Sequence, residues 1–428
     1  MTVTVAGAGL AGVEAAYALS RRGFDVKLYE MKPLKYSPAH KYPGFAELVC
    51  SNSFKADGLS SAAGLLKAEM RLLGSLTLEA AELTRVMAGG ALAVDRAAFS
   101  DEVTRRVKSA PNIEIIEGEV TEFPRKNAVI ATGPLTSDAL AEAIREKCGG
   151  LLNFYDAAAP VITAESIDFE KTFTASRYGK GGADYINCPL DEGEYEAFRD
   201  ALITAGTAPL REFDKPNYYE GCMPVEILAK RGRDALRFGC MKPVGLTVPK
   251  TGRRPFANAQ LRAENAGGSM YNIVGFQTNL KFGEQKRVFG MIPGLENAEF
   301  VRYGVMHRNT FLDGPRLLDA NFALRGAENV FFAGQITGVE GYMESAASGI
   351  MAGMALAARL LGKEPVAFPE TALTGALARY VSDKSVGVFQ PMGANMGLLP
   401  PLGFAVKGKR ERYGELAKRA LRDLKGVL

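Results

Sequence analysis

The protein is a chain of 428 residues, long enough for two or three structural units rather than one small core. Hydrophobic residues make up 47% of it and charged residues 23%, which excludes a largely disordered chain, and no apolar run reaches the roughly 18 residues of a membrane-spanning helix. The net charge of +4 permits a polyanionic partner without requiring one.

The first thirty residues carry a nucleotide-binding pattern. Residues 2–6 are a β-branched run that predicts a strand, and Gly7-Ala8-Gly9-Leu10-Ala11-Gly12 follows directly and opens a helical pattern through residue 19. Residues 26–30 predict a second strand that ends in Glu30, 18 residues after Gly12. The glycines would give a tight turn, room for a pyrophosphate and close helix packing, and Glu30 would accept from ribose hydroxyls. This order predicts a βαβ unit that binds a dinucleotide or an adenosyl group.

The remaining elements indicate a sheet that is interrupted and then resumed. Helical patterns cover residues 62–73, 80–88 and 95–108, and strands are expected at 113–117 and 128–130. Beyond residue 150 extended segments, many turns and a helix over 192–205 follow, and near residue 329 a strand again enters a glycine turn, with a small-residue helix over 346–361. We predict an α/β fold with a Rossmann-like FAD-binding domain of the glutathione-reductase type and an inserted α+β domain. The expected division is 1–150 and 295–428 for the FAD-binding domain, with a basic C-terminal helix, and 151–294 for the insertion.

Two further glycine segments favour FAD as the cofactor. The strand ending in Ala131-Thr132-Gly133 is similar to the segment that such flavoproteins lay beside the dinucleotide. Gly334-Gln335-Ile336-Thr337-Gly338 is similar to their C-terminal flavin-contacting turn, except that Gln335 replaces the usual acid. Adenosylmethionine-dependent enzymes also use a glycine turn and an acid, so that alternative stays open. A second glycine fingerprint is missing, so we expect NAD(P)H to bind transiently in the substrate cleft.

The cysteines argue against a metal site and leave two candidates for catalysis. Five cysteines lie far apart without a CxxC pair, and two histidines cannot complete a zinc site, so no metal is expected. The chain opens on a strand rather than an export signal, so we expect a cytoplasmic protein with free thiols and no membrane contact. Cys50 is followed by three small polar residues typical of an exposed turn, and Gly221 and Pro224 restrict the backbone around Cys222. Either thiol could be inert or reactive, and we expect inert thiols elsewhere.

Seven blocks resemble one known family. Residues 47–53, 89–96, 220–226, 241–245, 275–278, 306–310 and 338–342 are similar to the FAD- and folate-dependent tRNA (uracil-5-)-methyltransferases, the TrmFO family. The resemblance runs from the Gly7 turn to about Pro401. The related GidA group shares the glycine turn, but its chains are much longer at the C-terminus, which favours the first resemblance.

The resemblance implies methylation of uracil C5 in the T-loop of tRNA. The carbon would come from 5,10-methylenetetrahydrofolate and the electrons from NAD(P)H through FAD. By the family pattern Cys222 is the attacking thiolate and Cys50 a second catalytic thiol near the flavin. A thiolate that adds at C6 makes C5 nucleophilic, and a flavin can supply the electrons that convert methylene into methyl. His307 and Arg308 could line the folate or nicotinamide pocket, and His40 is a weaker candidate of the same kind.

Other functions remain open at this stage. A small-molecule flavin oxidoreductase, a flavin-containing RNA-binding protein without catalysis, or methylation of a ribosomal RNA uridine would share much of the pattern. Clusters of lysine and arginine occur in the insertion and in roughly the last twenty residues. If the substrate is tRNA, we expect these clusters to contact phosphates, because phosphate contacts dominate affinity for nucleic acids.

Overall fold

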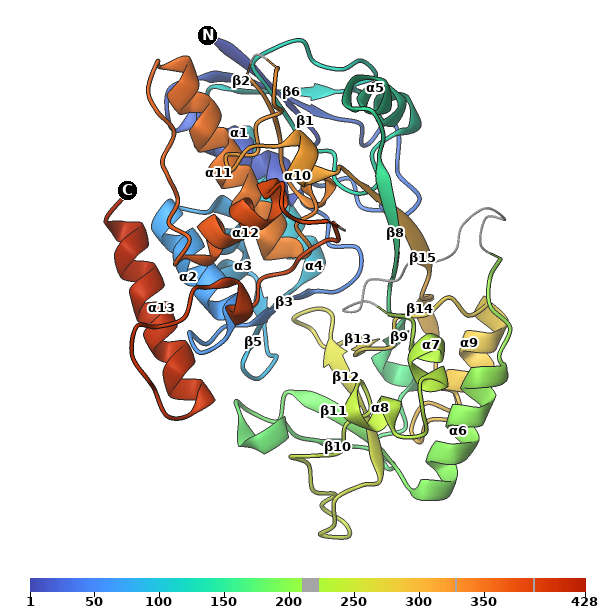
Figure 1. Ribbon diagram of the computed structural model, residues 1–428. Helices are drawn as coiled ribbons and strands as arrows, with labels where there is room; N and C mark the ends of the chain where they lie inside the picture. The colour runs from blue at the N-terminus through green and yellow to red at the C-terminus, as the bar shows by residue number, and fades with distance from the viewer. Residues whose placement is uncertain (210–222, 328, 388) are drawn as a thin grey trace.

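Five parallel strands form the first sheet of the protein (Figure 1). The computed structural model describes residues 1–209, 223–327, 329–387 and 389–428, and only the backbone of 153–156, 307 and 308. The strand order is β16-β7-β1-β2-β6, so the last strand of the chain lies beside strands from its beginning. The strands are β1 (Thr2–Ala6), β2 (Asp25–Glu30), β6 (Ile113–Glu117), β7 (Ala128–Ile130) and β16 (Val330–Phe332).

Helices bury both faces of this sheet, as a parallel sheet requires. In β7, Val129 packs into the core that includes α1 (Leu10–Ser20) and α11 (Tyr342–Leu360), whereas Ile130 packs with α5 (Asp138–Cys148) on the other face. A Cβ atom on Gly349 would lie 2.1 Å from the Ala11 carbonyl oxygen. The small residues of α11 therefore let two helix backbones approach closely, which explains its composition.

A helical layer and a small antiparallel sheet extend this part of the molecule. The sheet has the order β3-β5-β4, and α13 lies outside α2 (Figure 1). The expected helix over 80–88 is wrong: the helix ends at Leu83, and Arg85 and Val86 pair with Val94 and Ala93. The elements are α2 (Ala62–Leu73), α3 (Leu76–Leu83), α4 (Arg96–Ser109), α10 (Gly314–Leu317), α12 (Leu373–Ser382), α13 (Lys409–Lys425), β3 (Ser53–Ala56), β4 (Arg85–Val86) and β5 (Ala91–Val94).

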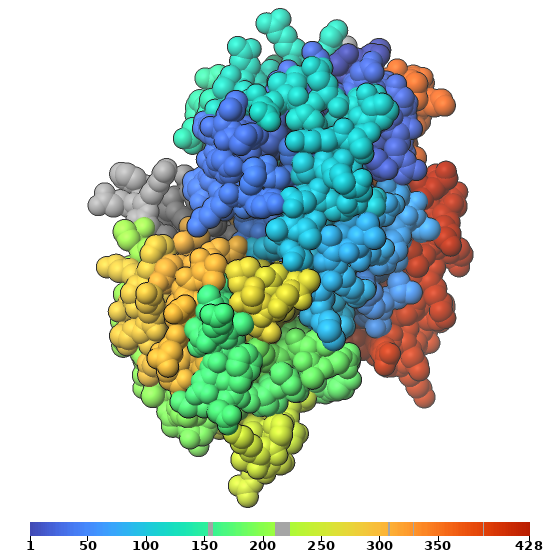
Figure 2. Space-filling view, turned by 180° about the vertical axis from the view of Figure 1, so that it is seen from behind, coloured from blue at the N-terminus to red at the C-terminus, as the bar shows by residue number. Residues whose placement is uncertain are grey.

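The second sheet has six antiparallel strands in the order β10-β11-β12-β13-β9-β14, with its own hydrophobic core. Figure 2 shows the corresponding green to orange surface below the blue and cyan surface of the first part. The strands are β9 (Val161–Thr163), β10 (Phe173–Thr174), β11 (Tyr185–Leu190), β12 (Ala257–Ala263), β13 (Met270–Ile273) and β14 (Phe300–Arg302). The helices are α6 (Glu192–Thr204), α7 (Val225–Lys230), α8 (Ala235–Phe238) and α9 (Phe282–Phe289).

A two-stranded antiparallel ribbon joins the two parts: β8 (Leu152–Ala157) pairs with β15 (Met306–Phe311). Figure 1 shows this ribbon running between the two sheets. The division at residues 150 and 294 stays a proposal, because strand pairing alone does not fix where one folding unit ends. Short 3₁₀ turns complete the chain at η1 (Ala164–Ser166), η2 (Arg177–Gly179), η4 (Gln335–Thr337) and η5 (Met396–Leu398).

Candidate active site

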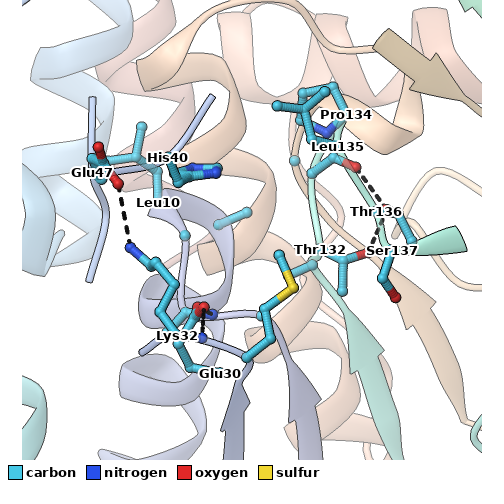
Figure 3. Close-up of a pocket in the computed structure, with 18 of the residues that line it drawn as sticks. Leu10, Glu30, Lys32, His40, Glu47, Thr132, Pro134, Leu135, Thr136 and Ser137 are labelled. Atoms are coloured by element: carbon cyan, nitrogen blue, oxygen red, sulfur yellow. Dashed lines mark hydrogen bonds and ion pairs between the residues drawn. The ribbon is translucent and has the colours of Figure 1, made fainter. Parts of the chain in front are cut away.

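A cavity opens at the carboxyl ends of β1, β2 and β7, where doubly wound sheets bind ligands. The space within it, open mouth included, is about 1110 Å³. Figure 3 shows Leu10, Glu30 and Lys32 facing the loop from Thr132 to Ser137 across it. Of the residues expected to bind the cofactor, nine line this cavity: Gly7, Ala8, Gly9, Leu10, Ala11, Glu30, Gly133, Gly334 and Gln335.

The three glycines of the first turn have different surroundings. Gly7 has a φ of +95°, and a Cβ there would lie 2.8 Å from the Ala131 carbonyl oxygen. A Cβ on Gly12 would lie 1.7 Å from the Gly7 carbonyl oxygen, so Gly12 closes the turn from behind and does not line the cavity. Gly9 caps α1, and a Cβ added there would meet no atom within 4 Å, so this side of the helix N-terminus stays open toward a ligand. This cradle fits a pyrophosphate held by backbone amides.

Glu30 is buried and already holds the turn in shape. Its carboxylate accepts from the backbone amides of Ala8 at 2.9 Å and Lys32 at 3.0 Å. A carboxylate has about four lone-pair positions, so two remain for ribose hydroxyls. Lys32 adds a feature that the sequence pattern does not predict. Its ammonium donates to the Gly44 carbonyl at 2.6 Å and pairs with Glu47 at 3.6 Å, which fastens the segment around His40 over the cavity.

The C-terminal glycine turn closes the cavity on its other side. Gly334 has a φ of +83° and donates its amide to the Ser348 hydroxyl at 2.7 Å. The Gln335 side chain donates to the buried Glu340 carboxylate at 2.7 Å. An acid therefore does lie beside this turn, but it comes from five residues later in the chain and is held by the glutamine.

Cys50 is hydrogen-bonded to Tyr342, which lines the cavity wall. The Cys50 and Ser51 amides donate to the Tyr342 phenol oxygen at 2.9 and 3.2 Å, and the Cys50 Sγ lies 2.9 Å from the same oxygen. Because two amides occupy the phenol oxygen's lone pairs, its hydrogen is directed to the sulfur. Burial, then the Cys50 charge, raises the pKa of Tyr342 well above 10, so the phenol stays protonated and donates. Tyr342 and Val49 line the cavity next to Cys50.

A cationic cluster surrounds the Cys50 turn. Arg96 donates to the Leu48 carbonyl at 2.6 Å and pairs with Glu264, and Arg262 donates to Asn52 and Ser51, each at 2.9 Å. Arg302 adds a third guanidinium, and burial lowers its pKa to about 10, with Cys50 and Tyr342 among the groups that act on it electrostatically. Three cations against one carboxylate favour an anion at this turn.

The remaining predicted site residues are Cys222, His307, Arg308 and His40. Cys222 lies outside the described residues, and the side chains of His307 and Arg308 are not described. Their backbone lies in β15, where His307 pairs with Asp156 of β8. Nearby, the Thr310 amide donates to Pro134 of the cavity wall at 2.9 Å. His40 lines the cavity, and burial raises the pKa of the Cys188 and Cys240 thiols, as expected for inert cysteines.

Within the described ranges, no helix is both long and apolar enough to cross a membrane. In the same part of the chain, no three His, Cys, Asp or Glu side chains gather as metal ligands would.

The fold and the cavity define a dinucleotide-binding protein with the glutathione-reductase type of α/β fold. Two crystal structures of GidA from Aquifex aeolicus superpose with TM-scores of 0.72 and 0.71, at 18% and 19% identity. They cover all of this chain and 73% and 76% of the GidA chains, and they confirm the predicted fold class.

The sequence relatives narrow this class. A family model described as glucose inhibited division protein A (GIDA) matches residues 2–364. The TrmFO protein of Acetivibrio thermocellus is 56% identical over 425 residues, which cover 99% of this chain and 98% of the relative. That of Pelotomaculum thermopropionicum is 58% identical over 425 residues, covering 99% and 97%. Both relatives are named methylenetetrahydrofolate–tRNA-(uracil-5-)-methyltransferase. The chain belongs to the TrmFO family.

Proposed function

We propose that this protein methylates C5 of a uracil in the T-loop of tRNA, with 5,10-methylenetetrahydrofolate as the carbon donor and NAD(P)H as the reductant. The observation that carries the proposal is the Cys50 thiol, bonded to Tyr342 at 2.9 Å beside a dinucleotide cradle. The names of the relatives at 56% and 58% identity support the same activity. FAD bound in the cradle, once reduced by NAD(P)H, would supply the electrons that reduce the transferred methylene to methyl.

The chain's own groups would divide the remaining chemistry. Gly7 to Ala11 would bind the pyrophosphate by backbone amides, Glu30 the ribose, and Gly133, Gly334 and Gln335 would border the rest of the cofactor. The Cys222 thiolate would add to C6 of the uracil, which makes C5 nucleophilic toward the one-carbon unit. Tetrahydrofolate and the C5 proton must then leave, and the Cys222 thiolate is expelled when reduction gives the methyl product.

Cys50 would take that proton. As a thiolate it would accept the hydrogen bond from Tyr342, and the charges of Arg96, Arg262 and Arg302 would stabilise it. When it accepts the C5 proton it becomes the neutral thiol. His307 and Arg308 are proposed to contact the folate or the nicotinamide from β15.

The direct test is methyl transfer by the holoenzyme. Unmodified tRNA, NADPH and carbon-labelled methylenetetrahydrofolate are incubated with the purified yellow protein, and label is sought in 5-methyluridine. We expect Cys222→Ala to lose transfer at least about 10³-fold and keep its flavin spectrum, because the nucleophile is lost but the cradle is not. Cys148→Ala is the matched control and should keep full activity, because burial raises the pKa of the Cys148 thiol to about 11.

Three outcomes would contradict or redirect the proposal. Full turnover by Cys222→Ala would refute its role as nucleophile. A flavin spectrum without label in tRNA would favour the small-molecule oxidoreductase, and label in ribosomal RNA instead of tRNA would move the same chemistry to another target.

A further inference from the structure

Three aromatic rings form a parallel stack on the surface of the second part of the molecule. Tyr303 lies between Phe282, at 4.5 Å between ring centroids and 17° between planes, and Phe300, at 5.1 Å and 3°. Phe300 packs against the core of the second sheet, whereas Phe282 is 54% exposed. The stack is thus rooted in the core at one end and open to solvent at the other.

The stack is held rigidly in place. The buried Gln285 of α9 donates to the Gly304 carbonyl and accepts from the Gly304 amide, both at 2.8 Å. This pair of bonds fixes the turn that carries Tyr303 against the helix that begins with Phe282. Figure 1 shows α9 and β14 side by side at the edge of the second part. A rigid ring loses little entropy when a planar group stacks on it.

The exposed ring lies in a cationic surrounding. Lys281, Lys286 and Arg287 are exposed beside it, and the one carboxylate of α9, Glu284, pairs with Arg287 at 2.6 Å. Three cations against one carboxylate leave a net charge of +2 on this short segment. An exposed aromatic face with surplus positive charge suits an unstacked base and its phosphates, because every base offers a π-face and every nucleotide an anion.

The stack adjoins the candidate active site through Arg302. Tyr303 directly follows Arg302, whose guanidinium interacts electrostatically with Cys50 and Tyr342. Hydrogen bonds also hold the chain before Phe282, from the Ala208 amide to the Asn279 carbonyl at 2.8 Å and from the Val225 amide to the Gln277 carbonyl at 2.7 Å.

We infer that Phe282, backed by Tyr303 and Phe300, is a stacking platform for an unpaired base of the tRNA loop that carries the target uracil, and that Lys281 and Lys286 bind the adjacent phosphates. This inference rests on the proposed function. It deepens that function by assigning an RNA contact surface outside the cofactor cavity.

The test compares tRNA binding by Phe282 variants of the FAD-loaded protein. Dissociation constants for unmodified tRNA are measured by fluorescence anisotropy, and KM and kcat by methyl transfer. Phe282→Leu should weaken binding by about 5-fold to 150-fold and raise KM with little change in kcat, since one base–aromatic stack is lost. Phe282→Tyr keeps the ring and should bind as the unchanged protein does. Phe238→Ala is the control, because Phe238 is 85% exposed but belongs to none of the ring stacks found among the described residues.

The charge contribution is measured separately. Lys281→Ala combined with Lys286→Ala should reduce the slope of log affinity against log salt by about 2, while Phe282→Leu should leave that slope unchanged. Binding by Phe282→Leu within 2-fold of the unchanged protein, or an equal loss in Phe238→Ala, would overturn the inference. So would a change in oligomeric state without a change in tRNA affinity. If the unchanged protein leaves tRNA unlabelled, the proposed function itself fails, whatever Phe282 does.

Discussion

At the scale of single residues, Tyr342 makes contacts that give it a proposed role beside Cys50. Its ring packs edge-on against Phe54 at 5.9 Å between centroids, and its phenol oxygen meets two amides and the Cys50 sulfur. The sequence indicates Cys50 through its polar turn, and Tyr342 only as the end of a family block. The bond between them joins residues 292 positions apart, so no local pattern predicts it.

Replacing Tyr342 tests this contact. Tyr342→Phe keeps the packing against Phe54 but removes the donor to the sulfur and the acceptor of two amides. We expect methyl transfer to fall by about 10²-fold or more, as for loss of a group that assists proton transfer, with FAD still bound. Single-turnover transfer and the absorbance near 450 nm measure the two effects.

Tyr380→Phe is the matched control for this substitution. Tyr380 also makes a hydrogen bond through its hydroxyl, to the Gln390 carbonyl at 2.8 Å, but it does not line the cavity. Full activity is expected. Equal losses in the two variants would mean that Tyr342 acts only through general stability.

At the scale of elements, the buried Glu69 carboxylate of α2 caps the N-terminus of a different helix, α12. Glu69 of α2 accepts from the Leu373 and Thr374 amides at 2.8 and 2.9 Å and so caps α12, more than 300 residues later in the chain. The limits of α2 follow from its sequence pattern. The capping role of Glu69 does not follow from the sequence pattern, because tertiary packing brings Leu373 and Thr374 to it.

The raised pKa of Glu69 predicts that the free energy of unfolding depends on pH. Burial raises its pKa to about 7 from 4.5, so the folded protein holds a proton that the unfolded chain releases between these values. The stabilisation is complete below pH 4.5 and is lost as the pH rises through 7, at most about 3 kcal/mol. Urea unfolding at pH 5 and pH 8 should show this loss in the unchanged protein but not in Glu69→Gln. Glu82→Gln, at an exposed site, should keep the same pH dependence as the unchanged protein.

At the scale of the whole molecule, two arginines hold the second sheet against the first part. Arg262 of β12 binds Asn52 and Ser51, and Arg96 of α4 pairs with Glu264 just beyond β12. The reactive turn at Cys50 therefore lies where the two parts meet. Its geometry depends on their docking as well as on either part alone.

Arg262→Met should loosen this junction. It leaves the buried Asn52 oxygen without its charged donor, and we expect about 3 kcal/mol lower unfolding free energy, from two lost hydrogen bonds to a charged group. Because the chain has no tryptophan, flavin fluorescence is a clean probe of unfolding in urea. The exposed Arg253→Met should lie within about 0.5 kcal/mol of the unchanged protein. An Arg262→Met variant of unchanged stability would contradict this account of the junction.

The fold class, the glycine cradle and the thiol candidates follow from the amino-acid sequence alone. These depend on short-range rules: a glycine turn after a strand needs particular residues at fixed spacing, and helices and strands follow local periodicity. The three-dimensional structure adds the hydrogen bond between Tyr342 and Cys50, the three arginines around that turn, the hydrogen bond from Gln335 to Glu340, and the stack of three rings that ends at Phe282. The Cys50–Tyr342 hydrogen bond and the arginine cluster join segments that are far apart in the chain, so packing of the whole chain decides them. The hydrogen bond from Gln335 to Glu340 spans only five residues, and it depends on the conformation of the turn between them.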